Sequence, residues 1–300
     1  MINTNQSFPA VSIIMPTYNS AAYIFDTVES IRNQTFKNWE LIIIDDGSDD
    51  DTLEIIEKLK DEQIVCYRLQ RSGLIGKIRK SGIEKASAAL IAFMDSDDLW
   101  ATTKLEEQVS AMEQNNDADF CLTGGYNFIK PLQPLDYFYK QKEGIKYGDL
   151  FISFFRSELA VYLQTLLFRK VCMADDTLFK ETDSDVDFML RLAKNFKGII
   201  IYKSLLFRRI HPTNDSNFNW KKNYNKGIRA IQSYATVTDT KIIKGAFFNL
   251  YINYGEDCLK NGERKNAIQH FFRAWIYKPV SIIPLKKIIK LGLSIFKNIK

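Results

Sequence analysis

The chain has 300 residues, of which 46% are hydrophobic and 13% are aromatic. This size allows one large folded domain, or one domain with a smaller extension. The formal net charge of +5 is modest, so it suits anionic small molecules or an anionic membrane surface and does not by itself indicate a nucleic-acid-binding protein.

Cysteine usage and the hydropathy pattern bear on the cellular compartment. The four cysteines lie far apart without a CxxC pair, and with only two histidines a structural zinc site is not expected. Isolated cysteines of this kind fit a reducing compartment. Residues 1–10 lack the basic and apolar regions of a signal peptide, and no apolar stretch approaches the roughly 18 to 20 residues that span a bilayer. We therefore expect a cytoplasmic protein.

Short apolar runs alternate with helical patterns along the first 125 residues. The runs are too short for amphipathic helices and lack polar alternation, which is typical of strands buried on both faces of a sheet. This alternation predicts an α/β fold with a doubly wound, mostly parallel sheet. Strands are predicted at 11–15, 41–44, 64–69, 90–94 and 120–123, and helices at 52–60, 77–88 and 100–115 and after Ser20.

Two of these strands run directly into acidic residues. Asp45 and Asp46 follow the strand at 41–44, and Asp95, Asp97 and Asp98 follow the strand at 90–94. The carboxyl ends of parallel strands share one edge of the sheet, where such folds bind their ligands. Crowded carboxylates repel one another unless a cation lies among them, and Mg²⁺ or Mn²⁺ prefers oxygen ligands. For an Asp-rich loop alone, the alternative is a solvated acidic turn.

The second half of the chain has weaker signals. Residues 125–150 lose periodicity and are rich in Tyr, Phe, Lys and Pro, so we expect an irregular, substrate-facing segment there. Strand-like runs follow at 163–168 and 199–202. Between these runs, an acidic segment at 183–187 opens an apolar helix, although acidic residues in a first helical turn can serve the helix dipole alone.

The pattern becomes helical from Trp220 onward, and we place a domain boundary near residue 217. Small and aromatic residues in 254–279 have the spacing of a helix pair. The tail at 285–300 mixes leucine and isoleucine with five lysines and has no acidic residue. It predicts either an amphipathic helix at a membrane interface or a surface helix that caps the core.

In their order and spacing, several segments resemble a family 2 glycosyltransferase of the GT-A fold. The resemblance is dense over about 8–125 and thin over 165–216. It implies a GT-A domain at 1–217, with a nucleotide-sugar half at about 8–125 and an acceptor and base half at about 126–217, followed by a C-terminal helical extension at 218–300. The matching segments are 11–19, 30–36, 40–48, Arg79 with Gly82, 93–100 and 104–106.

The resemblance implies a nucleotide-sugar donor, most simply a UDP-sugar, bound across the strand ends. An aromatic face covers a base, and a carboxylate accepts a base N–H, so Tyr18 and Asp46 suit the positions that they match. Alone, Tyr18 would be a packed aromatic and Asp46 a turn residue. Arg79 matches a position near the nucleotide phosphates. The implied donor-binding residues are Pro16, Tyr18, Asn19, Asp46, Arg79, Asp95 and Ser96.

Asp95, Ser96 and Asp97 match the DxD motif of the family. By that match Asp97 contacts Mn²⁺ or Mg²⁺, and Asp95 holds the ribose or a metal-bound water. The metal neutralises the charge that grows on the diphosphate as the sugar leaves. His211 lies in a segment that resembles the histidine motif of the family, which contacts metal or diphosphate; alone, it would be a structural histidine.

The resemblance implies that Asp185 is the catalytic general base. The apolar helix at 188–192 sets the register, although Ser184 replaces the Glu that is usual there, so Asp183 and Asp187 stay open as alternatives. The base takes the proton of the acceptor hydroxyl as that oxygen attacks the anomeric carbon opposite the leaving diphosphate. A single displacement of this kind inverts the configuration.

The prediction is therefore a metal-dependent, inverting glycosyltransferase that acts on a saccharide or lipid-linked acceptor in surface polysaccharide synthesis. The basic tail is compatible with contact with the inner-membrane surface as well as with a helix that caps the core, and the C-terminal helices could serve an oligomer. A nucleic-acid partner is disfavoured because the acidic strand ends would repel phosphates without a metal. The alternatives are a nucleotidyltransferase on the same sheet and a non-catalytic sugar-nucleotide-binding scaffold. A dehydrogenase is poorly supported because no GxGxxG follows the first strand.

Overall fold

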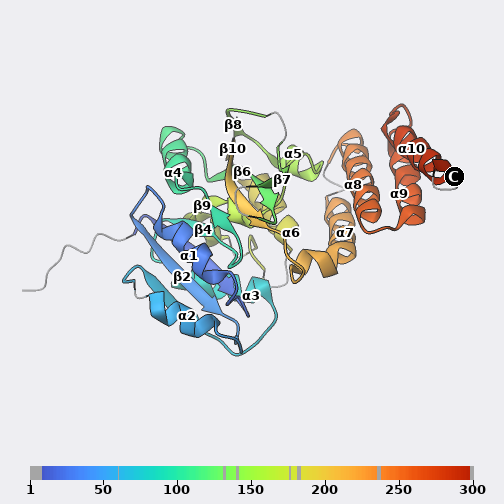
Figure 1. The fold of residues 1–300 in the computed structure, drawn as a ribbon. Helices are drawn as coiled ribbons and strands as arrows, with labels where there is room; N and C mark the ends of the chain where they lie inside the picture. The colour runs from blue at the N-terminus through green and yellow to red at the C-terminus, as the bar shows by residue number, and fades with distance from the viewer. Residues whose placement is uncertain are drawn as a thin grey trace, which may run out of the picture. The chain divides into compact units, whose positions relative to one another are not determined.

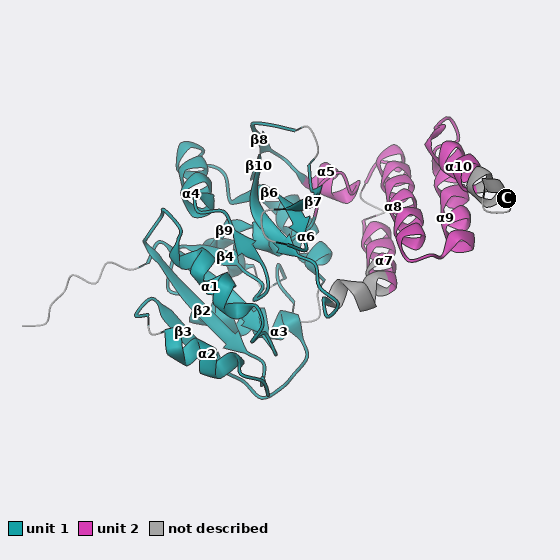
Figure 2. Cartoon of the chain, viewed as in Figure 1, with its two compact units in different colours: residues 1–150, 161–214 teal, residues 151–160, 215–300 magenta. Residues whose placement is uncertain are grey.

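The computed structural model describes residues 9–59, 61–130, 133–139, 142–175, 177–180, 184–234 and 238–297. The chain divides into two compact units, residues 1–150 with 161–214, and residues 151–160 with 215–300 (Figure 2). The sequence placed one boundary near residue 217 and left 151–160 within the first domain, whereas the structure groups 151–160 with the C-terminal helices. All described strands belong to the first unit.

A ten-stranded sheet forms the first unit (Figure 1). Its main path runs β3-β2-β1-β4-β9-β6-β10-β5, with β7 paired to β6 and β8 paired to β10. The short β9 is antiparallel to both β4 and β6, while β3, β2, β1 and β4 are parallel to one another. The predicted doubly wound, mostly parallel sheet is confirmed. The strands are β1 Val11–Thr17, β2 Trp39–Asp45, β3 Ile64–Arg68, β4 Leu90–Phe93, β5 Leu99–Trp100, β6 Phe120–Phe128, β7 Pro134–Tyr137, β8 Ile145–Gly148, β9 Leu167–Arg169 and β10 Gly198–Arg209.

Helices cover both faces of the sheet. On one face, α1, α2 and α4 share a buried apolar cluster with alternate residues of β1, among them Ile13 and Met15. On the other face, Ile14 meets Gly82 of α3, and Phe93 contacts Phe188 of α6. The alternation along β1 shows a strand buried on both faces, as its apolar run predicted. The helices of this unit are α1 Ile24–Arg32, α2 Thr52–Leu59, α3 Ile75–Lys85, α4 Lys104–Gln114 and α6 Asp185–Asn195, with 3-10 turns at Leu163–Thr165 and Lys170–Ala174.

Three sequence predictions are wrong in this unit. The strand-like run at 163–168 begins with a 3-10 turn at Leu163–Thr165, and the strand β9 starts only at Leu167. The helix predicted at 100–115 begins only at Lys104, because Trp100 pairs in β5 with Leu206 of β10. The segment predicted as irregular at 125–150 contains the end of β6 and the strands β7 and β8. A Cβ at Gly125 would lie 2.3 Å from the carbonyl oxygen of Leu206, so a glycine is needed for β6 to approach β10 closely there. These strands depend on non-local pairing, which leaves no local pattern.

The second unit consists of helices. A Cβ at Gly255 would lie 2.4 Å from the ring of Phe271, so this glycine lets α8 and α9 pack closely. Ile288 and Leu291 of α10 pack against the buried cluster that contains Cys258 and Phe271. Within the described part of the chain, no helix is both long enough and apolar enough to cross a bilayer. The helices are α5 Phe151–Phe155, α7 Asp215–Ser233, α8 Thr240–Lys260, α9 Arg264–Tyr277 and α10 Ile283–Lys297.

Candidate active site

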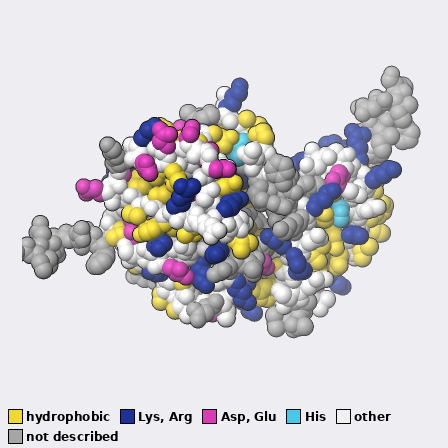
Figure 3. Space-filling view, turned by 90° about the horizontal axis from the view of Figure 1, so that it is seen from below, with side chains coloured by type: hydrophobic (Ala, Val, Ile, Leu, Met, Phe, Trp, Pro, Cys, Tyr) yellow, Lys and Arg dark blue, Asp and Glu magenta, His cyan; other side chains and the backbone are white. Residues whose placement is uncertain are grey.

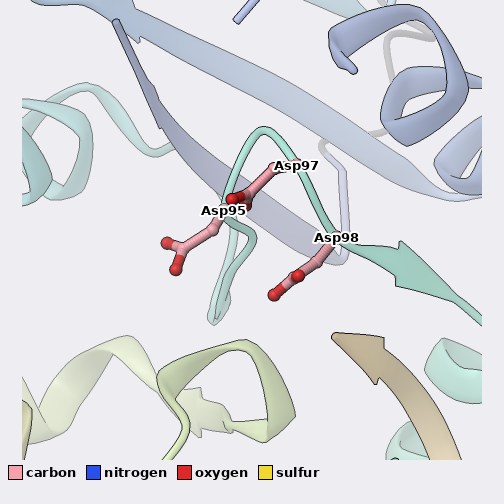
Figure 4. A group of neighbouring side chains, drawn as sticks. All are labelled: Asp95, Asp97 and Asp98. Atoms are coloured by element: carbon pink, nitrogen blue, oxygen red, sulfur yellow. The ribbon is translucent and has the colours of Figure 1, made fainter. Parts of the chain in front are cut away.

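Three aspartates lie together in the turn that joins β4 to β5. Ligand atoms of Asp95, Asp97 and Asp98 lie within 4.8 Å of one another, and Figure 4 shows the three side chains extending from this short turn. Because β4 is parallel to β1 and β2, the turn lies at the carboxyl edge of the sheet. The chain thus places carboxylate oxygens at a spacing that one hard cation could bridge.

Helix α1 holds this turn in place. Thr27 Oγ1 donates to the carbonyl oxygens of Ser96 at 3.0 Å and Asp98 at 2.9 Å. The Ser96 hydroxyl is 2.6 Å from the hydroxyl of Ser20 and is buried. The predicted donor-binding residue Ser96 therefore fixes the turn to the segment that precedes α1.

Asp98 forms the inner support of the acidic turn. Its side chain is buried, and its Oδ1 accepts the backbone N–H of Arg209 on β10 at 2.8 Å. Burial raises the pKa of Asp98 well above its usual range, and the nearby Asp97 and Asp95 raise it further. The Nε of Arg209 donates to the carbonyl oxygen of Asp97 at 2.9 Å, so β10 holds the turn from its other side.

Asp97 and His211 meet side chain to side chain. His211 Nε2 lies 2.8 Å from Asp97 Oδ2, and Asn214 Nδ2 lies 3.2 Å from the same oxygen. The His211 ring stacks on Tyr23 with centroids 4.5 Å apart, and its Nδ1 lies 2.9 Å from Thr213 Oγ1. Stacking and this second contact fix the ring so that Nε2 faces the carboxylate. A carboxylate oxygen beside an imidazole nitrogen is a ligand set that suits Mn²⁺.

A buried arginine connects Asp95 with Asp185. The Arg79 guanidinium donates to Asp185 Oδ1 at 2.7 Å and to Asp95 Oδ1 at 3.2 Å, although these residues are far apart in the sequence. Burial raises the pKa of Asp95, Arg79 opposes that rise, and Asp97 and Asp185 add to it. The predicted base and the first DxD aspartate are thus joined through one side chain that the sequence assigned to phosphate binding.

A second set of contacts positions Asp95 from the opposite side. Its Oδ2 accepts a hydrogen bond from Gln164 Nε2, in the 3-10 turn Leu163–Thr165. This turn is held by Trp100, whose indole N–H donates to the carbonyl oxygen of Gln164 at 3.2 Å. Gln108 Nε2 donates to the carbonyl oxygen of Thr165 at 2.9 Å. Asp95 is therefore anchored by α4 and β5 as well as by Arg79.

Gln108 is in turn held by a buried lysine. Lys104 Nζ donates to Gln108 Oε1 at 2.6 Å and lies 4.0 Å from the centre of the Trp100 ring. The Lys104 side chain is fully buried, and burial lowers its pKa to about 7. The charge is stabilised by an amide oxygen and an aromatic face rather than by a carboxylate.

The first turn of α6 holds two candidate bases, Asp185 and Asp187, which make different contacts. Ser184 is the N-cap residue, and it forms a capping box with Asp187: the Asp187 N–H donates to Ser184 Oγ at 3.3 Å, and the Ser184 N–H donates to Asp187 Oδ2 at 3.2 Å. Asp185 takes no part in the cap, and 38% of its side-chain surface is exposed. Asp183, the other alternative, lies outside the described residues.

The residues assigned to the nucleobase contact a loop of the same chain. Asp46 is fully buried and accepts the backbone N–H groups of Ser72 and Gly73, each at 2.8 Å, and a hydrogen bond from Arg71. Burial raises the pKa of Asp46, but these hydrogen bonds outweigh burial and the net shift is downward. The Arg71 guanidinium lies 3.5 Å from the centre of the Tyr18 ring. The segment Arg71–Gly73 therefore joins the two predicted base contacts.

Pro16 and Asn19 are the remaining predicted donor contacts. Pro16 lies in β1 opposite Ile44 of β2 and is buried. Asn19 has a φ of 48° and exchanges hydrogen bonds with Asp49, at 2.6 Å from Nδ2 and 3.0 Å to Oδ1. Asn19 thus connects the loops that follow β1 and β2.

Several contacts of the site were missed by the sequence reasoning. Arg209 and Asn214 flank His211 closely in the sequence, so the histidine segment could have drawn attention to both. Arg71 begins the loop that contains Gly73 and Gly76, which is a weaker signal for a functional residue than the histidine segment. Gln164 lies in a strand-like run without any pattern that marks it.

Comparison with known proteins identifies the family of this chain. The model described as Glycosyl transferase family 2 matches residues 12–167, and the chain belongs to this family. WfaP of Escherichia coli, a UDP-Glc:alpha-D-GlcNAc-diphosphoundecaprenol beta-1,3-glucosyltransferase, is 40% identical over 127 residues, which are 39% of this chain and 51% of WfaP. The chain spans about half the length of the curated relatives that it matches at this level of identity.

Solved structures confirm the fold. The complex of S. aureus TarS 1–349 with UDP-GlcNAc has a TM-score of 0.63 at 17% identity and covers 88% of this chain and 81% of that chain. Mannosyltransferase PcManGT from Pyrobaculum calidifontis, in complex with GDP-Man and Mn²⁺, has a TM-score of 0.62 at 12% identity and covers 97% of this chain and 81% of that chain. At these identities the likeness concerns the fold alone.

Proposed function

We propose that this chain is a metal-dependent, inverting glycosyltransferase that transfers a sugar from a nucleoside diphosphate, most simply UDP, to a saccharide or lipid-linked acceptor. The observation that carries this proposal is the Arg79 bridge, which brings Asp185 beside the acidic turn. Membership of family 2 and the names of WfaP and TarS, which use or bind UDP-sugars, support the donor class. The lipid-linked acceptor named for WfaP supports surface polysaccharide synthesis as the setting.

The proposed metal ligands are Asp97 and His211, which would hold Mn²⁺ or Mg²⁺. The donor set fits such an ion, and PcManGT was solved with Mn²⁺. When bound, the ion would neutralise charge on the diphosphate as the sugar leaves. Asp95, held by Arg79 and Gln164, would orient the ribose or a metal-bound water, and Asp98 would support the turn from within.

Asp185 is the proposed general base. Its contact with Arg79 directs the carboxylate toward the acidic turn, while its exposed surface leaves room for an acceptor hydroxyl. Asp187 is engaged by the cap of α6, which makes it the weaker candidate. The acceptor oxygen would attack the anomeric carbon as its proton passes to Asp185, and the configuration would invert.

The proposed nucleobase site is formed by Tyr18 and Asp46, with Pro16 and Asn19 shaping the loop beside them. Because Arg71 contacts both Tyr18 and Asp46, an incoming base would join or displace these contacts. The donor half would be residues 8–125 and the acceptor and base half 126–217. A lipid-linked acceptor would place the chain at the cytoplasmic face of a membrane.

A thermal-shift panel tests this function. UDP, GDP, dTDP, CMP and NAD are each added with Mn²⁺ and with chelator, because a ligand that binds only the native state raises the melting temperature. We expect one nucleoside diphosphate to stabilise the protein and the stabilisation to disappear on chelation. No response to any nucleotide would instead favour a non-catalytic scaffold, and release of pyrophosphate from a nucleoside triphosphate would identify a nucleotidyltransferase.

A further inference from the structure

The helical unit exposes a row of apolar side chains along α9. Phe272 and Ile276 are one helical turn apart and are exposed, and the row continues to Val280, which is 87% exposed in the turn after the helix. A spacing of four residues places side chains on one face of a helix. Large apolar side chains with this exposure and periodicity indicate a surface that contacts something other than water.

Helix α10, together with Ile282 just before it, adds a second row. Ile282, Leu285 and Ile289 are exposed, and they follow one another at intervals of three and four residues. Ile288 and Leu291 of the same helix instead face the core cluster of Cys258 and Phe271. The helix therefore caps the core with one face and leaves a separate apolar face outside. The two rows meet at the α9–α10 turn.

Basic residues border these two rows, and acidic residues are absent from this part of the sequence. Residues 264–300 contain nine Lys and Arg and no Asp or Glu. Arg273, Lys286 and Lys290 are exposed, and neither lysine is ion-paired among the residues that the structure describes. Over the helical unit in Figure 3, Lys and Arg side chains border hydrophobic ones, and few acidic side chains are in view.

We infer that the two rows, Phe272, Ile276, Val280, Ile282, Leu285 and Ile289, form a docking surface for an anionic lipid bilayer. Apolar side chains at a helix turn can enter the acyl boundary while the lysines beside them meet lipid phosphates. A second copy of the chain is a poorer partner, because it would bring the same positive charges face to face. Nucleic acid would neutralise the lysine charges but would leave the apolar side chains at the α9–α10 turn without an apolar partner.

The docking surface specifies how the proposed glycosyltransferase would reach a lipid-linked acceptor, namely through anionic lipids. It rests on the proposed function only in assuming that the acceptor lies at a membrane. The test is co-sedimentation of the full chain with two kinds of vesicle, phosphatidylcholine alone and equal parts of phosphatidylcholine and phosphatidylglycerol. We expect binding to the mixed vesicles that weakens as salt rises, because the attraction to charged headgroups is screened.

Matched pairs of variants locate the surface. The pair Val280→Asp with Ile282→Asp changes the docking turn, and Val171→Asp with Ile129→Asp changes apolar residues of the first unit that are also well exposed. We expect the first pair to weaken partition into mixed vesicles at least about tenfold and the second to leave it unchanged. Both should keep the melting temperature and the nucleotide response, so failure of docking is separable from failure of the proposed function.

A charge pair completes the test. Lys286→Glu with Lys290→Glu should weaken binding to the mixed vesicles at least about tenfold, whereas the same change at Lys241 and Lys244, exposed on α8, should have a smaller effect. The inference is overturned if the wild type ignores mixed vesicles, or if control and docking variants bind equally. It is also overturned if light scattering shows a dimer that Val280→Asp with Ile282→Asp dissociates, because the occupant would then be a second copy.

Discussion

The exchange of Asp185 or Asp187 for asparagine tests the base most directly. The two carboxylates are two residues apart in the first turn of α6, but one contacts Arg79 and the other caps the helix. Asparagine has nearly the shape of aspartate and keeps an oxygen that can accept the hydrogen bond from Arg79, so Asp185→Asn removes basicity with little change in geometry.

The expected magnitudes differ sharply between the two variants. A positioned general base contributes about 10²–10⁴ in rate, or about 3–5 kcal/mol of the activation barrier. Asp185→Asn should therefore lower kcat by about that factor and leave the affinity for UDP nearly unchanged. Asp187→Asn weakens a capping box and removes a negative charge from a helix N-terminus, which costs about 0.5–2 kcal/mol of unfolding free energy. Its kcat should stay within about threefold of the wild type.

The assay measures sugar transfer, donor affinity by calorimetry with Mn²⁺, and unfolding by denaturant for both variants. Rates are compared in conditions where each variant is fully folded, since Asp187→Asn is the less stable of the two. Loss of transfer in Asp187→Asn together with retained transfer in Asp185→Asn would refute the assignment. Loss of UDP binding in Asp185→Asn would instead show that the residue supports the donor site through Arg79.

Three further predictions concern other contacts of the site. Burial lowers the pKa of Lys104 from its ordinary value of 10.5 to about 7 in the folded chain. Between these pH values the unfolded chain therefore binds more protons than the folded chain. Below pH 7 the cost of the buried charge reaches its full value, and Lys104 lowers the free energy of unfolding by up to about 5 kcal/mol. Lys104→Met should therefore gain stability relative to the wild type at pH 6, and the gain should fade as the pH rises to 10; a difference independent of pH would contradict this. Asp97→Ala should weaken Mn²⁺ binding at least about tenfold by calorimetry, and unchanged affinity would count against its role. Arg71→Ala should change UDP affinity measurably while leaving the melting temperature of the free protein within a few degrees, and an unaltered affinity would show that the base binds elsewhere.

The sequence predicted the parts of the fold and the site that have local signals. Short runs of four or five mostly apolar residues marked β1, β2 and β4, and acidic residues directly after β4 marked the turn with Asp95 and Asp97. These signals depend on neighbours in the chain, so they survive without an alignment. The mostly parallel sheet and the family were predicted correctly for this reason.

The missed elements depend on contacts between distant segments. β5 has two residues and exists because Trp100 and Leu99 pair with β10. Gln164 reaches Asp95 from 69 residues away, and Arg209 reaches Asp98 from 111 residues away. No periodicity or spacing in the sequence predicts such pairs. Each pair forms only when the sheet brings the end of β4 close to the turn before β9 and to the end of β10.

The two acidic segments that looked alike in the sequence differ in how their charges are compensated. At the end of β2, Asp46 is satisfied by Arg71–Gly73, and Asp50 accepts the N–H groups of Ala21 and Thr52, so these carboxylates are used within the fold. At the end of β4, Asp95 and Asp97 lie beside Asp98 and near Asp185, and the buried Arg79 forms ion pairs with Asp95 and Asp185. A diphosphate brought to this edge would add negative charge to an existing excess. We therefore expect donor binding to depend on a cation at Asp97 more than on any one protein side chain, so chelation should weaken UDP binding more than Arg71→Ala does.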